Sequence, residues 1–349
     1  MRMKTRLYLI LLVLIFDTTA FAVCLYAQNE IHWLPNQPGK WSYKHQLYGE
    51  IGDYKLTPGE VAGYRQKIET MVETFHQNPV LKNPVGFEPS INVRIFDENT
   101  GFMRTPLTKP LTKLLVGGRI AILFCPYFQD KSGQVQKHCM EVTSCDIDFN
   151  YPKSTAESYL NYGADGYHED LSAAADKLNR VFIKPRVVKE LAEGVTAYSS
   201  GIIVVAGTTR PPYWIPVTID ELFKLQLDYY ELNYKLNKEE YVSEIINVIK
   251  NDRATYSPEQ LKLPAYYNSS TIARITDNEN ENPYMQFNPE YFDRSLPRND
   301  VQIIAVHTLT EVYNDNCNCS KYNNYEAQKH CAFVKQIDAN ALKALLDVK

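Results

Sequence analysis

Apolar residues recur at helical spacing after Thr57, and this pattern predicts an amphipathic helix. Thr57 is followed by Pro58 and by Glu60, which together form a capping box with a proline in the first turn. The apolar positions that follow define one stripe, which consists of Val61, Tyr64, Ile68, Met71, Val72 and Phe75. The pattern ends at Pro79. We expect this stripe to face a core.

Strand patterns follow the predicted helix. Residues 90–97 alternate between apolar and polar side chains, whereas residues 118–128 are apolar on both faces, so each of those faces needs a cover. A turn at 130–133 leads into the segment 134–150. Its last part alternates Cys145, Ile147 and Phe149 with Ser144, Asp146, Asp148 and Asn150, which predicts a half-exposed strand. The chain therefore predicts an α+β fold in which the Thr57 helix packs on an antiparallel sheet of these three segments.

The second half of the chain predicts further helices and strands. Residues 151–180 are polar and form a connection with one short helix at 170–178. Later segments predict strands at 201–206 and 301–306, helices that begin after Thr218 and Asn237, and a terminal helix over 339–346 capped by Asp338. We expect the helices after Thr218 and Asn237 to form a second, C-terminal layer. The predicted division is a signal peptide (1–27), an N-terminal α+β domain (28–150), a connection (151–180) and a C-terminal α+β domain (181–349).

The first 27 residues have the three parts of a secretory signal peptide. Basic residues precede an apolar run, and small residues at Ala22 and Ala27 offer cleavage sites. An uncleaved anchor is less favourable because Asp17 would enter the bilayer at a cost of about 2.5–3.5 kcal/mol. A lipid-modified Cys24 would follow Val23, a poor neighbour for that modification. We therefore expect cleavage, a secreted or periplasmic protein, and no stable membrane span in the mature chain.

Composition narrows the classes of partner. Without the predicted signal peptide, 34 Lys and Arg face 40 Asp and Glu, a net charge of −6. No basic stripe is present, which argues against nucleic-acid binding. Tyrosine is frequent, with 25 residues. Tyrosines suit partner-binding surfaces, but half-buried strands are the favoured explanation for them.

The mature chain keeps six cysteines, and an even number in an exported protein predicts three disulfides. All six are candidates: Cys125, Cys139, Cys145, Cys317, Cys319 and Cys331. A three-residue hairpin loop with Gly133 in the left-handed region pairs Asp130 with Gln134. This register places Cys125 opposite Cys139 at a non-hydrogen-bonded site, where the Cα atoms are about 4.5 Å apart. Pro126 argues against a complete ladder there, because it has no amide hydrogen to donate.

If Cys125 pairs with Cys139 and all six cysteines are in disulfides, Cys145 must pair with one of the three C-terminal cysteines. Cys317 and Cys319 would lie on the same face of an extended segment, too close to bridge each other. Cys145 then pairs with either Cys317 or Cys319, and Cys331 pairs with the other.

A metal site is the alternative use of these cysteines. The tetrapeptide Gln-Lys-His-Cys occurs twice, at 136–139 and 328–331. However, neighbouring residues on a strand point to opposite faces, so the His and Cys of one tetrapeptide cannot easily reach one ion. The pattern typical of zinc sites, two cysteines with two residues between them, is also absent. We therefore expect no metal and no cofactor.

Catalytic motifs do not appear in the sequence. Asp146 and Asp148 share one strand face, but no spacing along the chain shows that two carboxylates flank a cleft. None of the seven histidines has a recognisable partner. The sequence therefore identifies no catalytic, cofactor-binding or metal-binding residue, and the protein's partners stay unknown. It favours a non-catalytic exported protein that binds a ligand or partner, with a secreted hydrolase of carbohydrate or peptide as the alternative.

Overall fold

The computed structural model of the chain describes residues 32–41, 43, 47–48, 57–97, 115–139, 144–150, 168–267, 275–276, 282–288, 290–309, 312–313, 317–322 and 324–347. The predicted signal peptide, with Cys24, lies outside the described residues. None of the helices described combines the length and the hydrophobicity that crossing a bilayer requires.

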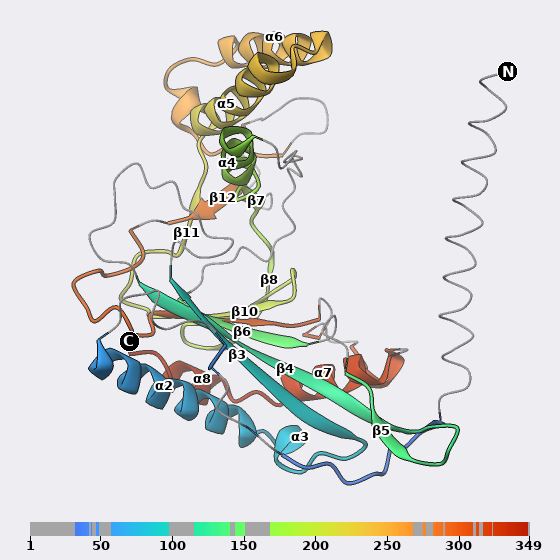
Figure 1. Ribbon diagram of the computed structural model, residues 1–349. Helices are drawn as coiled ribbons and strands as arrows, with labels where there is room; N and C mark the ends of the chain where they lie inside the picture. Colours follow the sequence, from blue (N-terminus) through green and yellow to red (C-terminus); the bar gives the residue numbers. More distant parts are fainter. Residues whose placement is uncertain are drawn as a thin grey trace, which may run out of the picture.

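Within the described residues, ten strands form one sheet that runs through both halves of the sequence (Figure 1). The order is β2-β3-β4-β6-β13-β10-β9-β8, and β1 and β5 also pair with β4. The pairs are antiparallel except β2–β3, which is parallel. The strands are β1 (His32–Trp33), β2 (Leu47–Tyr48), β3 (Phe87–Asp97), β4 (Val116–Gln129), β5 (Val135–Lys137), β6 (Cys145–Phe149), β8 (Val187–Ala192), β9 (Val195–Tyr198), β10 (Ile202–Ala206) and β13 (Ile303–His307). The predicted α+β class is confirmed.

Helices cover one face of this sheet, as Figure 1 shows for α2, α7 and α8. The helices described on this side are α2 (Pro58–His76), α3 (Pro79–Lys82), α7 (Tyr325–Lys335) and α8 (Ala339–Ala344). The predicted stripe of α2 is buried from Tyr64 to Phe75 and belongs to one core with Ile120, Ile147 and Ile304 of the sheet. The predicted packing of the Thr57 helix on the antiparallel sheet is therefore confirmed.

The capping box at the start of α2 also forms as predicted. The Thr57 hydroxyl accepts from the Glu60 amide, and the Thr57 amide donates to Glu60 Oε2 at 2.8 Å. Arg298 donates to the same carboxylate, with 2.8 Å between Nε and Oε1. The hydrogen bond from Arg298 lowers the pKa of Glu60 and outweighs burial, which raises it. Together with the Thr57 bonds it lowers the pKa of Glu60 to about 2.

A second layer lies on the other side of the large sheet. A small sheet of β7 (Phe182–Ile183), β12 (Tyr284–Phe287) and β11 (Trp214–Pro216) separates the large sheet from three helices in Figure 1. These are α4 (Glu169–Leu178), α5 (Ile219–Asn237) and α6 (Glu240–Ala254). Trp214 is a buried anchor between the two sheets, with ring-centroid distances of 5.1 Å to Phe182 and 5.0 Å to Tyr198. The predicted second helical layer is therefore present.

Two details of the helices differ from the sequence prediction. Asn237 does not cap α6 but ends α5, and its side chain donates to Asn233, because Lys238 takes the left-handed conformation between the helices. The helix α7 was not expected at all. Its buried face includes Glu326 and His330, and these polar residues interrupt the apolar pattern by which a helix is recognised.

The hairpin between β4 and β5 has the predicted register. Gly133 is left-handed (φ 81°), and the Asp130 amide donates to the Gln134 carbonyl at 2.9 Å. The strand β5 ends at Lys137, so His138 and Cys139 of the predicted segment 134–150 lie beyond the strand, and residues 140–143 of that segment lie outside the described residues. The cause of this early end is Pro126, which has no amide hydrogen, although its carbonyl still accepts from the His138 amide at 3.0 Å.

Strands from both predicted domains lie side by side in the large sheet. The central pair joins β6 to β13, with Asp148 opposite Ala305. The predicted connection 151–180 leads from β6 of the large sheet to β7 of the small sheet, and the chain returns to the large sheet at β8. Its residues 151–167 lie outside the described parts of the chain. The domain boundaries at 150 and 181 stay a prediction about folding units.

Candidate functional site

The large sheet carries a group of charged side chains on the face that points away from α2. We call Arg119, Asp146, Asp148 and His307 the Asp148 cluster. Arg119 lies on β4, the two aspartates on β6 and His307 at the end of β13. Strand pairing places Arg119 directly opposite Asp148, and His307 follows Val306, the partner of Ile147. Because side chains alternate along a strand, these four residues share one face while Ile120, Ile147 and Val306 enter the core on the other.

Asp148 is the centre of this cluster. Arg119 donates to its two oxygens, with Nε 2.6 Å from Oδ1 and a terminal nitrogen 3.0 Å from Oδ2. His307 Nε2 lies 2.8 Å from Oδ2. Arg119 also lies 3.1 Å from Asp146 through its other terminal nitrogen. The Asp148 side chain is 0% exposed, whereas the side chain of His307 is 20% exposed. The strand was expected to be half-exposed, and this expectation is wrong for Asp148 because its partners cover it.

The electrostatics of the cluster follow from this geometry. Burial is the largest influence on Asp148 and by itself would raise the pKa of its carboxyl group. The hydrogen bonds and positive charge of His307 and Arg119 outweigh burial and hold that pKa below its ordinary value of 3.8. The carboxylate is therefore ionised and paired at neutral pH. A buried carboxylate needs such partners, because an unpaired one would cost several kcal/mol.

The chemistry open to the cluster centres on His307. A carboxylate on one ring nitrogen fixes the orientation and tautomer of a histidine, which prepares the other nitrogen for proton transfer. In the part of the chain that the structure describes, Asp148 is the hydrogen-bond partner of the ring, and no serine, threonine or cysteine side chain bonds to it. The pair thus provides an oriented base without a described nucleophile beside it.

Cavities are found on the other side of the sheet. One of about 420 Å³ lies between the end of α2, the start of α3 and the start of α8, where Phe75, Asn78, Ile337 and Leu342 are among its lining residues. Another of about 390 Å³ follows the polar side of α2, beside Glu69 and Glu73. Neither cavity is lined by the Asp148 cluster.

The six cysteines that the structure describes include two pairs at disulfide distance. Cys125 and Cys139 lie opposite each other as the hairpin register predicts, with Cα atoms 4.4 Å apart. Cys319 and Cys331 form the second pair, with Cα atoms 5.5 Å apart. Cys145 and Cys317 remain thiols.

The predicted bridge from Cys145 to the C-terminal cysteines is wrong. The alternation along β6 directs Cys145 into the core under the helices, where its thiol donates to the His307 carbonyl at 3.4 Å. Burial, followed by the charge of Asp146, raises the pKa of this thiol. The short helix η4 (Cys319–Lys321) instead brings Cys319 to Cys331 of α7, so the pair forms locally.

The repeated tetrapeptides do not form a metal site in the parts described. The cysteines of both are in disulfides, and His138 lies 3.4 Å from Glu326 rather than beside His330. His330 stacks on the Phe124 ring at a centroid distance of 5.8 Å. Among the described residues, no three His, Cys, Asp or Glu side chains converge on a position for a metal ion.

Sequence reasoning missed the Asp148 cluster. It grouped Asp146 with Asp148 but found no partner for any histidine, and Arg119 was expected only as part of an apolar strand. The available signal was a charged residue on an otherwise apolar strand, at Arg119, together with a histidine directly after the strand 301–306. Comparisons of the chain with family models, with curated proteins and with solved structures found no match.

Proposed function

We propose that this protein is exported and acts without catalysis, by binding a protein partner through the layer of α5 and α6. Export is supported by the predicted signal peptide and by two cysteine pairs at disulfide distance. Disulfide bonds form and persist in oxidising compartments. The mature chain should begin near Val23 or Gln28. Sequencing of the N-terminus of the exported protein tests this part, and recovery of Met1 on the folded protein would contradict it.

One observation carries the binding role. Among the residues that the structure describes, eight large hydrophobic side chains are exposed, and five of them lie on 236–267. These five are Leu236, Tyr241, Val248, Leu263 and Tyr267. Tyr241 and Val248 are 57% and 61% exposed and lie two turns apart on α6, so they share one face of this helix. Large apolar side chains exposed on one face of a helix, as these two are, are typical of interaction sites.

Contacts between α5 and α6 hold the two helices of this surface together. Lys250 of α6 pairs with Glu231 of α5 at 2.7 Å, and Arg253 pairs with Asp220 at 2.6 Å. Ile249 packs between the helices in a core with Leu222 and Phe223. In Figure 1 the layer lies at the far end of the molecule from α2 and α8, where a partner can approach it.

A photo-cross-linking amino acid at Tyr241 tests the binding role in cells that export the protein. The matched control carries the same amino acid at Val135, which is 51% exposed on β5. We expect a protein adduct of defined mass from position 241, none from position 135, and loss of the adduct with Val248→Glu. Equal adducts from both positions, or none from either, would refute the proposal.

A secreted hydrolase is the second candidate, because the Asp148–His307 pair has the geometry of an oriented base. Purified protein is assayed against panels of glycosides and peptides with His307→Gln and with His32→Gln, an exposed histidine on β1, as control. Our proposal expects no turnover that depends on His307. Turnover that is lost in His307→Gln and kept in His32→Gln would establish the hydrolase instead.

A further inference from the structure

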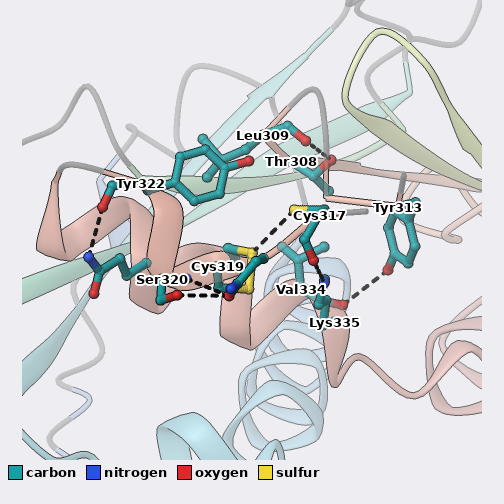
Figure 2. Close-up of a disulfide and its surroundings, with 12 residues drawn as sticks. Thr308, Leu309, Tyr313, Cys317, Cys319, Ser320, Tyr322, Val334 and Lys335 are labelled. Atoms are coloured by element: carbon teal, nitrogen blue, oxygen red, sulfur yellow. Dashed lines mark hydrogen bonds between the residues drawn. A yellow bond between two sulfur atoms is a disulfide. The ribbon is translucent and has the colours of Figure 1, made fainter. Parts of the chain in front are cut away.

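Three sulfur atoms meet where η4 packs on α7. Cys319 and Cys331 form the disulfide, and the Cys317 thiol lies 4.0 Å from Cys331 Sγ (Figure 2). Cys317 and Cys319 are two residues apart, so their side chains reach Cys331 from the same segment. Cys331 is thus in contact with two candidate partners and bonded to one of them.

The backbone around these sulfurs is held in place on both sides of Cys317. The Tyr313 hydroxyl donates to the Val334 carbonyl at 3.0 Å, and Lys335 Nζ donates to the Cys317 carbonyl. The Asn318 side chain accepts from the Ser320 amide at 3.1 Å and so caps η4. Figure 2 shows Tyr313 with Val334, and Lys335 with Cys317, beside the sulfur group. They keep the Cys317 thiol against the α7 residue with which it could pair.

We propose that Cys317, Cys319 and Cys331 are an internal thiol–disulfide exchange site. The Cys317 thiolate attacks Cys331 Sγ, the Cys317–Cys331 bond forms, and the Cys319–Cys331 bond breaks. Cys319 leaves as a thiolate and takes up a proton, in place of the one that Cys317 lost to solvent. One S–S bond replaces another, so no oxidant or reductant is consumed. The free thiol thereby moves between positions 317 and 319.

Accessibility separates this site from the other free cysteine. Cys317 and Cys319 are both half-buried, whereas Cys145 is fully buried in the core beneath the sheet. The thiolate is the nucleophile in exchange, and a thiol enclosed by apolar side chains rarely forms it. Cys145 is therefore a built-in control, because a thiol reagent should reach it only after unfolding.

Alkylation of the native protein tests the exchange. The protein is incubated at about pH 8.5, near the pKa of a free thiol. It is then labelled with iodoacetamide, quenched in acid and digested without reduction, and fragmentation of the peptide ending at Lys321 locates the label. We expect two species: label on Cys317 with Cys319–Cys331 linked, and label on Cys319 with Cys317–Cys331 linked. Label on Cys317 alone, at every incubation time, would overturn the proposal.

Two variants make the result specific. Cys317→Ser removes the attacking thiol, so the label on Cys319 should be lost completely, and its persistence would contradict the mechanism. Cys319→Ser leaves Cys317 as the one neighbouring partner, so the refolded variant should contain the Cys317–Cys331 disulfide. Free thiols at both 317 and 331 in this variant would show that the second pairing is not accessible. Cys145 should stay unlabelled in the same digests, which shows that the protein remains folded during labelling.

Discussion

Replacing Asp148 should destabilise the fold far more than replacing Asp146, although both carboxylates contact Arg119 from the same strand. Asp148→Asn keeps the shape of the side chain but places an amide nitrogen among the donors of Arg119 and His307. Removing one partner of a buried ion pair costs about 3–5 kcal/mol, because it leaves a charge without compensation. Arg119 keeps its contact with Asp146 and is 24% exposed, so we expect a loss near the lower limit, about 3 kcal/mol.

The matched control is Asp146→Asn. The Asp146 side chain is 24% exposed and lies 3.1 Å from Arg119, and a solvent-accessible pair of this kind contributes about 0–1 kcal/mol. Urea unfolding at neutral pH, followed by circular dichroism, gives the free energy of unfolding of each variant and of the parent. If the two variants lose the same stability within about 0.5 kcal/mol, burial does not control the strength of this cluster and the reasoning is refuted.

The difference between the parent and Asp148→Asn should also depend on pH. The pKa of Asp148 is lowered in the folded state, so the unfolded state binds the proton more tightly and protonation favours unfolding. The stabilisation from Asp148 is therefore complete above its ordinary pKa of 3.8 and is lost as the pH falls below that value. The difference in the free energy of unfolding between the parent and Asp148→Asn should therefore be smaller at acidic pH than at neutral pH. A constant difference across this range would contradict the assignment.

Three further predictions concern other parts of the fold. Glu60 has a folded pKa of about 2, chiefly because of Arg298, against an ordinary value of 4.5, so it stabilises the protein above 4.5 and less as the pH falls toward 2. Glu60→Gln should flatten the pH dependence of stability in that range. Ile68→Asp should cost about 4 kcal/mol in thermal or urea unfolding, since residue 68 is 1% exposed beneath the sheet, and a parent-like melt would contradict the packing of α2. The double replacement of Cys125 and Cys139 by serine should remove about 3 kcal/mol under non-reducing conditions, given their separation of 14 residues; an unchanged free energy would show that this bridge is not formed in solution.

Local rules explain the parts of the fold that the sequence predicted. The Thr57 capping box depends on residues three positions apart, and the hairpin register depends on the five residues from Asp130 to Gln134. In both cases the chain makes the decisive hydrogen bonds with its near neighbours. The pairing of Cys125 with Cys139 follows from the same register by counting along two strands. Such features need no knowledge of the remaining chain.

The missed features have the opposite character. Helix α7 does not show a clean apolar stripe because its buried face includes Glu326 and His330. Their surroundings come from His138, which follows β5, and from Phe124 of β4. The assumption that every cysteine pairs led to the wrong bridge from Cys145. The side of the sheet on which a cysteine lies, and the element that packs against it, decide which sulfurs meet.

The sequence by itself determined the amphipathic helix, the apolar central strands, the hairpin and the even set of cysteines, because periodicity and turn chemistry are local. Only the tertiary structure decided that Arg119, Asp148 and His307 meet, since they come from three strands spread over most of the chain. Their partnership depends on the strand order β4-β6-β13, and no spacing in the sequence encodes that order. The same holds for Cys331, whose two possible partners are near in sequence but are brought within bonding reach by the packing of η4 on α7.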